Sequence, residues 1–434
     1  MHDGATSAKE RARSRAAERD LGRLGVTVVP SGWKLSTVGK ACTIRNDLRL
    51  PLSVETRSAM QGEYPYYGPT GVLDYLDEFR AEGEFALIGE DGDHFLDTAK
   101  KSQTVRVSGR FNVNNHAHLI ASGKGCAVDW FFQFFRHRDI SHSLTRQGAG
   151  RYKLTKQALE KLPILLPPLP EQRKIAEILR TWDEALEKLS ALRAAKLKRH
   201  RGLTMALVFG GRQLERFRKT SEVTPHRWFE LPGSWNCQHI GDLATEISER
   251  NGEGDQHEVL SCSKHDGFVR SLGYFKKQVF SADLTGYRKI WRGDFGFPSN
   301  HVEEGSIGLQ NLTDIGVVSP IYTVFRFNPD QVNAEYAFAV LKTELYRHIF
   351  EVSTSASVDR RGSLRWSEFS RLPFPVPPLD EQKAIADVLR TSRRELDALT
   401  DEIEAVSRQK RGLMQKLLTG EWRVNLKSDE KEFS

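Results

Sequence analysis

The sequence has few cysteines, and none of them forms a pair with the spacing of a metal-binding or redox motif. Its four cysteines, Cys42, Cys126, Cys237 and Cys262, lie far apart in a chain of 434 residues. We therefore predict reduced thiols rather than a disulfide framework or a zinc site. No apolar run approaches the length needed to cross a bilayer, and the N-terminus has no hydrophobic signal core. These absences predict a cytoplasmic protein with no metal site and no membrane contact.

Motifs for phosphate and cofactor chemistry are also missing. The segment SGKG at 122–125 lacks the spacing of a phosphate-binding loop. There is no Asn/Asp-Pro-Pro-Tyr/Phe motif of the kind that amino-methyltransferases use, and no glycine-rich cofactor loop follows a strand. No pair of carboxylates with a lysine indicates a nuclease centre. We therefore expect a binding protein without catalytic residues and without a cofactor of its own.

The composition indicates globular domains and an anionic partner. Hydrophobic residues make up 39% of the chain, which is enough to bury a core, and the length suits two or three domains. The formal net charge is +7 and the isoelectric point is about 9.1. A basic excess of this size favours nucleic acid as a partner, although it also occurs in proteins that bind none.

One long stretch occurs twice. Residues 162–210 align with residues 372–420 without a gap at an offset of 210, and 20 of the 49 paired positions are identical. Such self-similarity dictates the architecture. The repeating unit is a variable region followed by a long helix, which begins after Pro-Pro-Leu with an acid in its first turn (Glu171 or Glu381) and ends near a glycine.

Each helix carries an apolar stripe with the 4-3-4-3 spacing of a coiled-coil seam. The first seam is interrupted by Arg193, Lys196 and His200, and Leu192 and Leu197 could continue it on a shifted face. We expect the two helices to pair antiparallel within the chain, with two independent dimerisation helices as the alternative. The apolar seam residues are Ile175, Leu179, Trp182, Leu186, Leu189, Leu203, Leu207, Ile385, Leu389, Leu396, Leu399, Ile403, Val406, Leu413 and Leu417.

The variable regions also begin alike. VPSGWKLSTVGK at 29–40 matches LPGSWNCQHIGD at 231–242, and we expect Trp33 and Trp235 to anchor the two domain cores. The resulting division is a polar extension (1–28), a first domain (29–161), a first long helix (162–211), a linker (212–230), a second domain (231–371), a second long helix (372–420) and a tail (421–434). The extension reads as helical or disordered and could contact DNA or a partner.

Short strands alternate with turns rich in glycine, aspartate and asparagine in both domains, which predicts an α/β fold with a twisted sheet. We expect strands at 85–89, 103–109, 258–263 and 322–327. Helices are expected at 129–138 and 334–350, where the aromatic residues are better explained as core than as a site.

Several segments carry side chains suited to DNA. YPYYGPTG at 64–71 reads as an aromatic loop, and NVNNHAH at 112–118 offers amides that can bond to adenine edges. TRQGAGRYKLT at 145–155 and its counterpart ASVDRRGSLRW at 356–366 place basic groups at the same point of each repeat; ordinary turn residues are the alternative throughout. The candidate DNA-contacting residues are Tyr64, Tyr66, Tyr67, Asn112, Asn114, Asn115, His116, Arg146, Gln147, Arg151, Lys153, Lys276, Lys277, Arg288, Asn300, His301, Arg360, Arg361 and Arg365.

The doubled PPLxEQ motif, each copy followed by a long helix ending in RGLxxxL, resembles the specificity subunit of type I restriction-modification enzymes. The motif residues are Pro167, Pro168, Leu169, Glu171, Gln172, Pro377, Pro378, Leu379, Glu381 and Gln382. The resemblance implies two α/β target-recognition domains in tandem, related by a pseudo-twofold axis. Each would be followed by a helix of an antiparallel coiled coil, and together they would read a bipartite asymmetric DNA target.

The resemblance also implies the partners. These are double-stranded DNA and two modification subunits, which methylate adenine; restriction subunits could join them. S-adenosylmethionine and ATP belong to those partner subunits, not to this chain. Three alternatives stay open: the specificity subunit of a methylation-only system, a catalytic nuclease-methyltransferase fragment, and a coiled-coil scaffold that binds no DNA.

Overall fold

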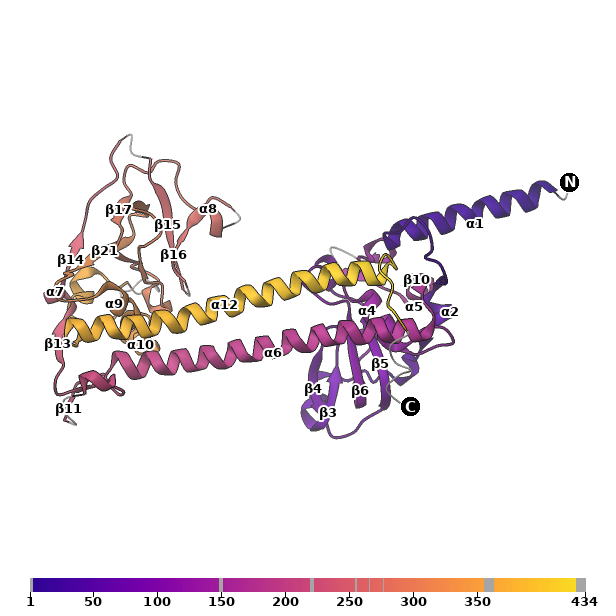
Figure 1. Cartoon of the computed structure of the whole chain (residues 1–434), viewed down its shortest axis with the longest axis horizontal. Helices are drawn as coiled ribbons and strands as arrows, with labels where there is room; N and C mark the ends of the chain where they lie inside the picture. Colours follow the sequence, from indigo (N-terminus) through magenta and orange to yellow (C-terminus); the bar gives the residue numbers. More distant parts are fainter. Residues whose placement is uncertain are drawn as a thin grey trace. The chain divides into compact units, whose positions relative to one another are not determined.

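A computed structural model describes residues 3–147, 151–218, 222–253, 256–264, 266–275, 277–354 and 363–426. The chain forms two compact units, one from Met1–Leu189 with Ile403–Ser434 and the other from Ser190–Glu402. Each unit contains one α/β domain and a stretch of each of two long helices, α6 (Leu169–Val208) and α12 (Leu379–Leu418). Figure 1 shows both helices as continuous ribbons, so each helix contributes to both units.

The first unit begins with a helix, α1 (Asp3–Leu24). The sequence alone did not decide between a helix and a disordered segment here. Its C-terminal end is fastened to the domain, because Leu21 and Leu24 are buried in the core. Arg138 Nη1 also donates to the carbonyl oxygen of Leu24 at 3.0 Å. Burial lowers the pKa of Arg138 to about 10, which leaves the guanidinium charged at neutral pH beside the negative end of the helix.

The first domain is built on a six-stranded sheet in the order β2-β7-β5-β6-β3-β4. The strands β5 and β6 were predicted as shorter runs. The three tyrosines lie in strand β3 and not in the expected loop; Tyr66 is fully buried, and Tyr64 and Tyr67 are half-buried. The strands of this sheet are β2 (Thr43–Ile44), β3 (Gln61–Tyr67), β4 (Val72–Leu76), β5 (Ala81–Gly89), β6 (Thr104–Val113) and β7 (Ala117–Ala121).

Short helices and two two-stranded sheets complete the first domain. Strand β1 pairs antiparallel with β10, and β8 pairs antiparallel with β9. These elements are β1 (Lys34–Thr37), α2 (Val38–Ala41), η1 (Asn46–Leu48), α3 (Val54–Ala59), η2 (Asp93–Leu96), α4 (Val128–Phe135), η3 (Ser141–Ser143), β8 (Thr145–Gln147), β9 (Arg151–Lys153), α5 (Lys156–Lys161) and β10 (Pro163–Leu166).

Aromatic packing organises the first core, as the sequence predicted. Trp33 and Trp130 meet edge to face at 5.6 Å between ring centroids. The indole of Trp130 donates to the Leu165 carbonyl oxygen at 2.9 Å, so the fully buried N–H has a partner. Phe134 and Phe135 of α4 pack beside it and are also buried. The aromatic cluster is therefore core, not a site.

The second domain carries two four-stranded sheets, in the orders β14-β21-β18-β19 and β16-β15-β20-β17. Its strands are β13 (Asn236–His239), β14 (Ala244–Ile247), β15 (Glu258–Ser263), β16 (Gly267–Arg270), β17 (Arg288–Trp291), β18 (Phe295–Pro298), β19 (Gly308–Leu309), β20 (Ile315–Val318), β21 (Tyr322–Phe327) and β22 (Pro373–Val376). The expected strands at 258–263 and 322–327 are confirmed as β15 and β21.

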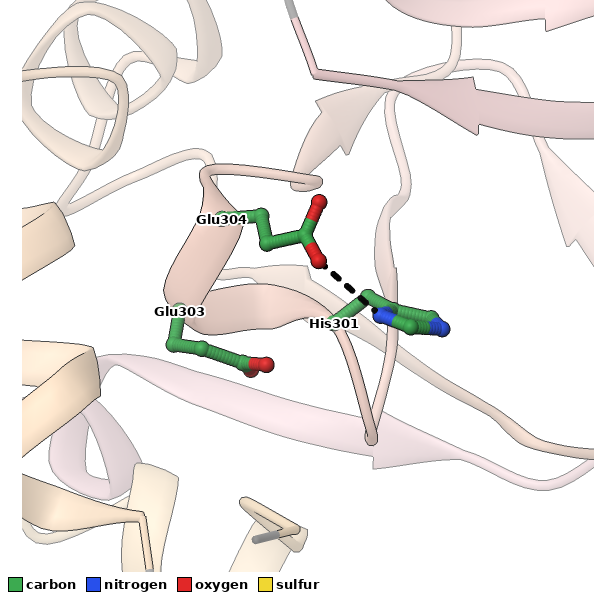
Figure 2. A group of neighbouring side chains, drawn as sticks. All are labelled: His301, Glu303 and Glu304. Atoms are coloured by element: carbon green, nitrogen blue, oxygen red, sulfur yellow. Dashed lines mark ion pairs between the residues drawn. The ribbon is translucent and has the colours of Figure 1, made fainter. Parts of the chain in front are cut away.

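The helix expected at 334–350 is two helices. The first ends at Leu341, and Thr343 caps the second, its hydroxyl accepting the backbone N–H of Tyr346 at 3.2 Å. The other elements of this unit are η4 (Glu215–Phe217), β11 (Val223–Pro225), β12 (Glu230–Pro232), α7 (Ile240–Leu243), α8 (Ser271–Tyr274), η5 (Val302–Glu304; drawn with His301 in Figure 2), α9 (Ala334–Leu341), α10 (Glu344–Ser353) and α11 (Trp366–Phe369).

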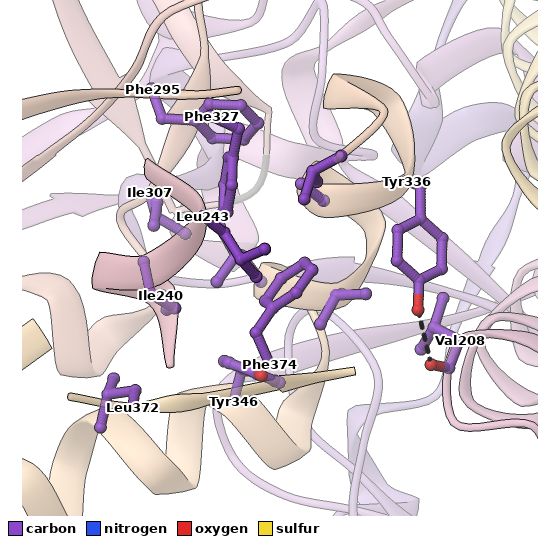
Figure 3. Packing of buried hydrophobic residues seen from close by; sticks show 14 of the residues in the cluster. Val208, Ile240, Leu243, Phe295, Ile307, Phe327, Tyr336, Tyr346, Leu372 and Phe374 are labelled. Atoms are coloured by element: carbon purple, nitrogen blue, oxygen red, sulfur yellow. Dashed lines mark hydrogen bonds between the residues drawn. The ribbon is translucent and has the colours of Figure 1, made fainter. Parts of the chain in front are cut away.

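The second core ties the end of α6 to the second domain (Figure 3). Tyr336 is fully buried, and its hydroxyl donates toward the carbonyl oxygens of Val208 at 3.1 Å and Pro375 at 3.2 Å. Figure 3 shows Phe374 and Tyr346 packed below Leu243 in the same cluster. The C-terminus of one repeat's helix is thus part of the next repeat's core.

The long helices pair antiparallel within each unit, as predicted. In the first unit Ile175 and Leu179 of α6 share a core with Leu413 and Leu417 of α12. In the second unit Leu207 of α6 shares a core with residues near the start of α12, including Ile385 and Leu389. Every predicted apolar seam residue is buried or half-buried. The shifted stripe is wrong at Leu192, because its side chain is 45% exposed.

The polar residues that interrupt the seam find partners on α12. Arg193 Nε donates to the Thr400 hydroxyl at 2.7 Å, and Lys196 Nζ donates to Glu395 at 2.8 Å. His200 Nδ1 lies 3.0 Å from the Ser392 hydroxyl. These pairs satisfy the polar groups, so the interruption leaves the helix pairing intact, and they favour this register over a slipped one.

Candidate nucleic-acid interface

Three loops of the first domain meet at the ends of β5, β6 and β9. The backbone N–H of Glu90 donates to the His116 carbonyl at 2.8 Å, and that of Leu154 donates to the Glu90 carbonyl at 2.7 Å. Asp91 and Lys153 form an isolated antiparallel bridge. The fold therefore brings together the Asn-rich turn after β6 and the basic hairpin β8–β9, which the sequence singled out separately.

Three predicted contact residues are buried and cannot face DNA in this conformation. Tyr66 is fully buried, and its hydroxyl donates to the Leu50 carbonyl at 2.8 Å. Asn112 is also fully buried, and its amide donates to the Glu78 carbonyl at 2.7 Å. The side-chain oxygen of Asn114, Oδ1, accepts the backbone N–H of His116 at 2.9 Å and shapes the turn. These residues hold the domain together, and their burial contradicts the DNA contacts predicted for them.

Other predicted residues of this domain remain at the surface. Asn115 and His116 are exposed at the tip of the turn, and His116 Nδ1 lies 2.8 Å from Asp91 Oδ2. Tyr64 and Tyr67 are half-buried. Tyr64 packs against Phe79 at 5.1 Å between centroids, and Tyr67 packs against Phe111. Partial burial raises the pKa of Tyr67, with Tyr75 adding a smaller effect. The turn, rather than the tyrosines, presents exposed polar side chains.

The basic hairpin β8–β9 presents one cation and anchors another. Arg146 is exposed, with its guanidinium 6.0 Å from the Tyr152 ring centroid. Lys153 is directed instead to Glu90, with its ammonium 3.1 Å from the carboxylate. Gln147 and Arg151 lie in the two strands, but their side chains are outside the described part of the structure.

In the second domain, the loop after β18 meets the chain just before α11. The Leu364 N–H donates to the Ser299 carbonyl at 2.9 Å, as Leu154 does to Glu90 in the first domain. Asn300 and His301 follow Ser299, and Arg365 follows Leu364; His301 and Arg365 are exposed and Asn300 is half-buried. These three predicted residues therefore gather at a place equivalent to the first-domain cluster.

The remaining basic candidates of this domain are scattered. Arg288 is half-buried and pairs with Glu246 at 3.3 Å, whereas Lys277 is exposed. Lys276, Arg360 and Arg361 lie outside the described residues.

Beside this cluster lies the group His301, Glu303 and Glu304 (Figure 2), whose potential ligand atoms lie within 4.8 Å of one another. His301 Nδ1 is 3.4 Å from Glu304, and both side chains are about half exposed, at 50% and 54%. An exposed ion pair accounts for this proximity. Among the described residues, no other group of three such side chains meets at this spacing.

Comparisons with known proteins agree on one family. The family described as "Type I restriction modification DNA specificity domain" matches residues 30–198 and 293–408, well over half of the chain. The chain belongs to this specificity family. Within it, the MjaVIII type I restriction enzyme specificity subunit of Methanocaldococcus jannaschii is 22% identical over 409 residues, covering 91% of this chain and 94% of the relative.

Two further relatives of the specificity family are similar over different extents. A putative type I restriction enzyme specificity subunit of Haemophilus influenzae is 33% identical over 147 residues, which cover 34% of this chain and only 36% of that relative. The crystal structure of the type I restriction-modification S subunit of M. genitalium superposes with a TM-score of 0.56 at 13% identity, covering 89% of this chain and 96% of that one. The latter likeness confirms the fold.

The duplicated PPLxEQ motif of this specificity-family chain joins each domain to its helix. The indole of Trp33 donates to Glu171 at 3.1 Å, and that of Trp235 donates to Glu381 at 3.0 Å. The two glutamates are buried, so they are more than the helix-dipole acids that the sequence indicated. Arg423, after α12, also donates to Glu171 through two nitrogens at 2.6 and 2.9 Å.

The motif glutamines make the second half of each joint. Gln172 donates to the carbonyls of Gly125 and Pro167, both at 2.8 Å, and accepts the Ala127 N–H at 2.9 Å. Gln382 repeats the pattern with Gln331, Pro377 and Asn333. Both side-chain amides are fully buried and satisfied. The motif therefore fixes the orientation of each domain against the first turn of its own helix.

None of the helices in the described ranges is long and apolar enough to span a membrane.

The sequence did not indicate Arg49, Glu90 and Asp91 as part of the candidate interface. They are dispersed along the chain, and only the fold brings them beside the basic hairpin.

Proposed function

We propose that this chain is the DNA sequence-recognition subunit of a type I restriction-modification complex, in which each α/β domain reads one half-site. One observation carries the proposal: two domains with different sequences are fixed by the same motif to the same type of helix pair, and each presents its candidate loops at an equivalent place. Different loop residues at equivalent places suit an asymmetric target of two blocks separated by an unread gap.

The exposed groups divide into two roles. Asn115, His116, Asn300 and His301 lie on turns and have the donors and acceptors that read base edges. Arg146, Lys277 and Arg365 are exposed cations suited to phosphate oxygens. Because binding through phosphates releases counterions, the affinity for DNA falls steeply as the salt concentration rises.

The chain acts without catalysing a reaction itself. Partner modification subunits, two in number because the unit of domain and helix occurs twice, bind S-adenosylmethionine and methylate adenine on each strand. Restriction subunits bind ATP and cleave DNA. The known functions of the family support this division, and a methylation-only complex is the second candidate.

Methylation mapping tests the proposal. DNA from cells that carry this chain with its modification subunit is compared by long-read sequencing with DNA from cells that lack only this chain. We expect the loss of one adenine-methylation motif made of two short blocks around a fixed gap. A continuous or palindromic motif would refute the two-domain model. No DNA binding by the purified complex at low salt would favour a scaffold without DNA.

A further inference from the structure

A mostly buried carboxylate, Glu90, lies directly under the candidate DNA-reading loops of the first domain. Its two oxygens lie 2.8 Å from Arg49 Nη1 and 3.1 Å from Lys153 Nζ, and its side chain is 14% exposed. His118 Nε2 is 3.8 Å away. Three segments far apart in the sequence, after η1, in β7 and in β9, therefore meet at one carboxylate.

The geometry fixes the protonation of the surrounding groups. His118 Nε2 faces the Leu154 carbonyl at 2.8 Å, so this nitrogen carries the proton. His118 Nδ1 then accepts from Arg49 at 2.6 Å and from Asn46 at 2.9 Å, which requires a neutral imidazole. Burial lowers the pKa of His118 and agrees with this neutral form. Glu90 is consequently the anion that balances Arg49 and Lys153.

The equivalent position in the second domain is uncharged. Ser299 occupies it, because Leu364 donates to its carbonyl and its own N–H donates to the Ile321 carbonyl at 3.3 Å. The Ser299 hydroxyl also donates to Ile321, at 3.0 Å. The loops of the two domains are therefore fixed by different chemistry at the same place.

We propose that Glu90 is a positioning residue that holds the turn after β6 and the β8–β9 hairpin in their reading geometry, and so sets the fidelity for the first domain's half-site alone. The inference rests on the proposed function. Lys153 is the link, because it belongs to β9, whose partner strand carries the exposed Arg146. Loss of the charge at Glu90 leaves two cations facing each other and releases the hairpin, whereas the second domain has no part in this network.

The test uses the full complex and reads both half-sites in one experiment. Glu90→Gln is mapped by long-read methylation beside Glu82→Gln. This control removes the same charge from an exposed ion pair with Arg110 and lies on β5, the strand that Glu90 follows. For Glu90→Gln we expect methylation at sites with one mismatch in a single block to rise about tenfold, a change within the usual cost of one mismatched pair. The other block and the control should keep wild-type fidelity.

The lysine provides a second route if Glu90→Gln fails to assemble. Lys153→Met should relax the same block, whereas Lys153→Arg, which keeps the charge, should not. Relaxation of both blocks, or of neither block in an assembled complex, would overturn the role of Glu90. Absence of a two-block motif with the wild-type chain would instead reject the proposed function, so the two failures are distinguishable.

Discussion

The two α/β domains share one strand order, yet the first has a continuous sheet and the second a divided one. Strands β3, β4 and β6 of the first domain correspond to β15, β16 and β20, because both sets contain one parallel and one antiparallel pair in the same order. Strand β5 pairs with both β6 and β7. Its counterpart is broken into β17 and β18, which pair with β20 and β21 separately.

The break lies at Arg292–Asp294 and has a local cause. Gly293 has φ +92°, a conformation that other residues rarely adopt. Asp294 is fully buried, accepts the Trp291 N–H at 2.8 Å and pairs with Arg326 at 2.5 Å. One topology can therefore tolerate a bend in a central strand when a buried carboxylate accepts the backbone N–H that the bend leaves unpaired. Domains of this kind can therefore diverge in shape while keeping their joint to the helices.

The helix pairing also differs between the two units, because a buried charged contact is present in the first unit and its equivalent in the second unit is exposed. The largest expected effect comes from breaking this contact. Lys410, at a buried seam position, donates to Asp183 at 2.5 Å, and Arg136 donates to the same carboxylate at 2.6 Å. Asp183→Ala leaves a buried ammonium without its anion, so we expect the first unit to lose about 3 kcal/mol of unfolding free energy. Hydrogen exchange of peptides from 175–189 and 403–418 measures the loss.

The repeat supplies a matched control for this substitution. Arg393 occupies the position equivalent to Asp183 at the offset of 210, and its exposed side chain pairs with Asp397 on the same helix. Arg393→Ala should change the unfolding free energy of the second unit by less than about 0.5 kcal/mol. Equal effects of the two substitutions would show that the buried charged contact does not contribute more to the unfolding free energy than an exposed ion pair does.

The motif glutamines should behave alike, because their three hydrogen bonds are alike. Gln172→Ala and Gln382→Ala each leave buried backbone groups without partners, at a cost of about 2 kcal/mol in the unit concerned. Unit-resolved hydrogen exchange again gives the measurement, with Gln415→Ala, an exposed position of α12, as a control. A loss confined to one of the two variants would contradict the equivalence of the joints.

The sequence predicted this duplicated frame well and the loops poorly. The helix pair and the Trp anchors follow from local patterns that occur twice. The roles of Glu90 and Asp294 do not, because their partners lie far away in the chain. Tyr66 and Asn112 were misassigned because partners elsewhere in the chain bury them. The Tyr66 hydroxyl bonds to Leu50 and the Asn112 amide bonds to Glu78, and local composition does not show these contacts.

The bend in the second sheet offers a smaller test. Gly293→Ala places a side chain on a backbone with positive φ, in open space, so we expect a loss of about 1 kcal/mol from backbone strain alone. Gly273→Ala, also in open space but without positive φ, is the matched control. Denaturant titration of both variants, followed by tryptophan fluorescence, compares them. Equal midpoints would mean that the bend does not require glycine.

The smallest expected effect is a pH dependence that belongs to the first domain. Burial lowers the pKa of His118 in the fold, so the unfolded chain binds the proton more readily. The stability that comes from the neutral His118 is therefore fully present above the ordinary histidine pKa of about 6.5. It is lost as the pH falls toward the lowered value, by at most about 1.4 kcal/mol per pH unit.

The variant His118→Gln tests this dependence, because glutamine keeps a donor and an acceptor but does not titrate. Its unfolding free energy should fall less than that of the wild type between about pH 7 and pH 5.5, while His94 and His137, whose pKa values burial also lowers, contribute equally to both proteins. Identical pH profiles would mean that folding does not change the pKa of His118, and would contradict the neutral imidazole assigned from its hydrogen bonds.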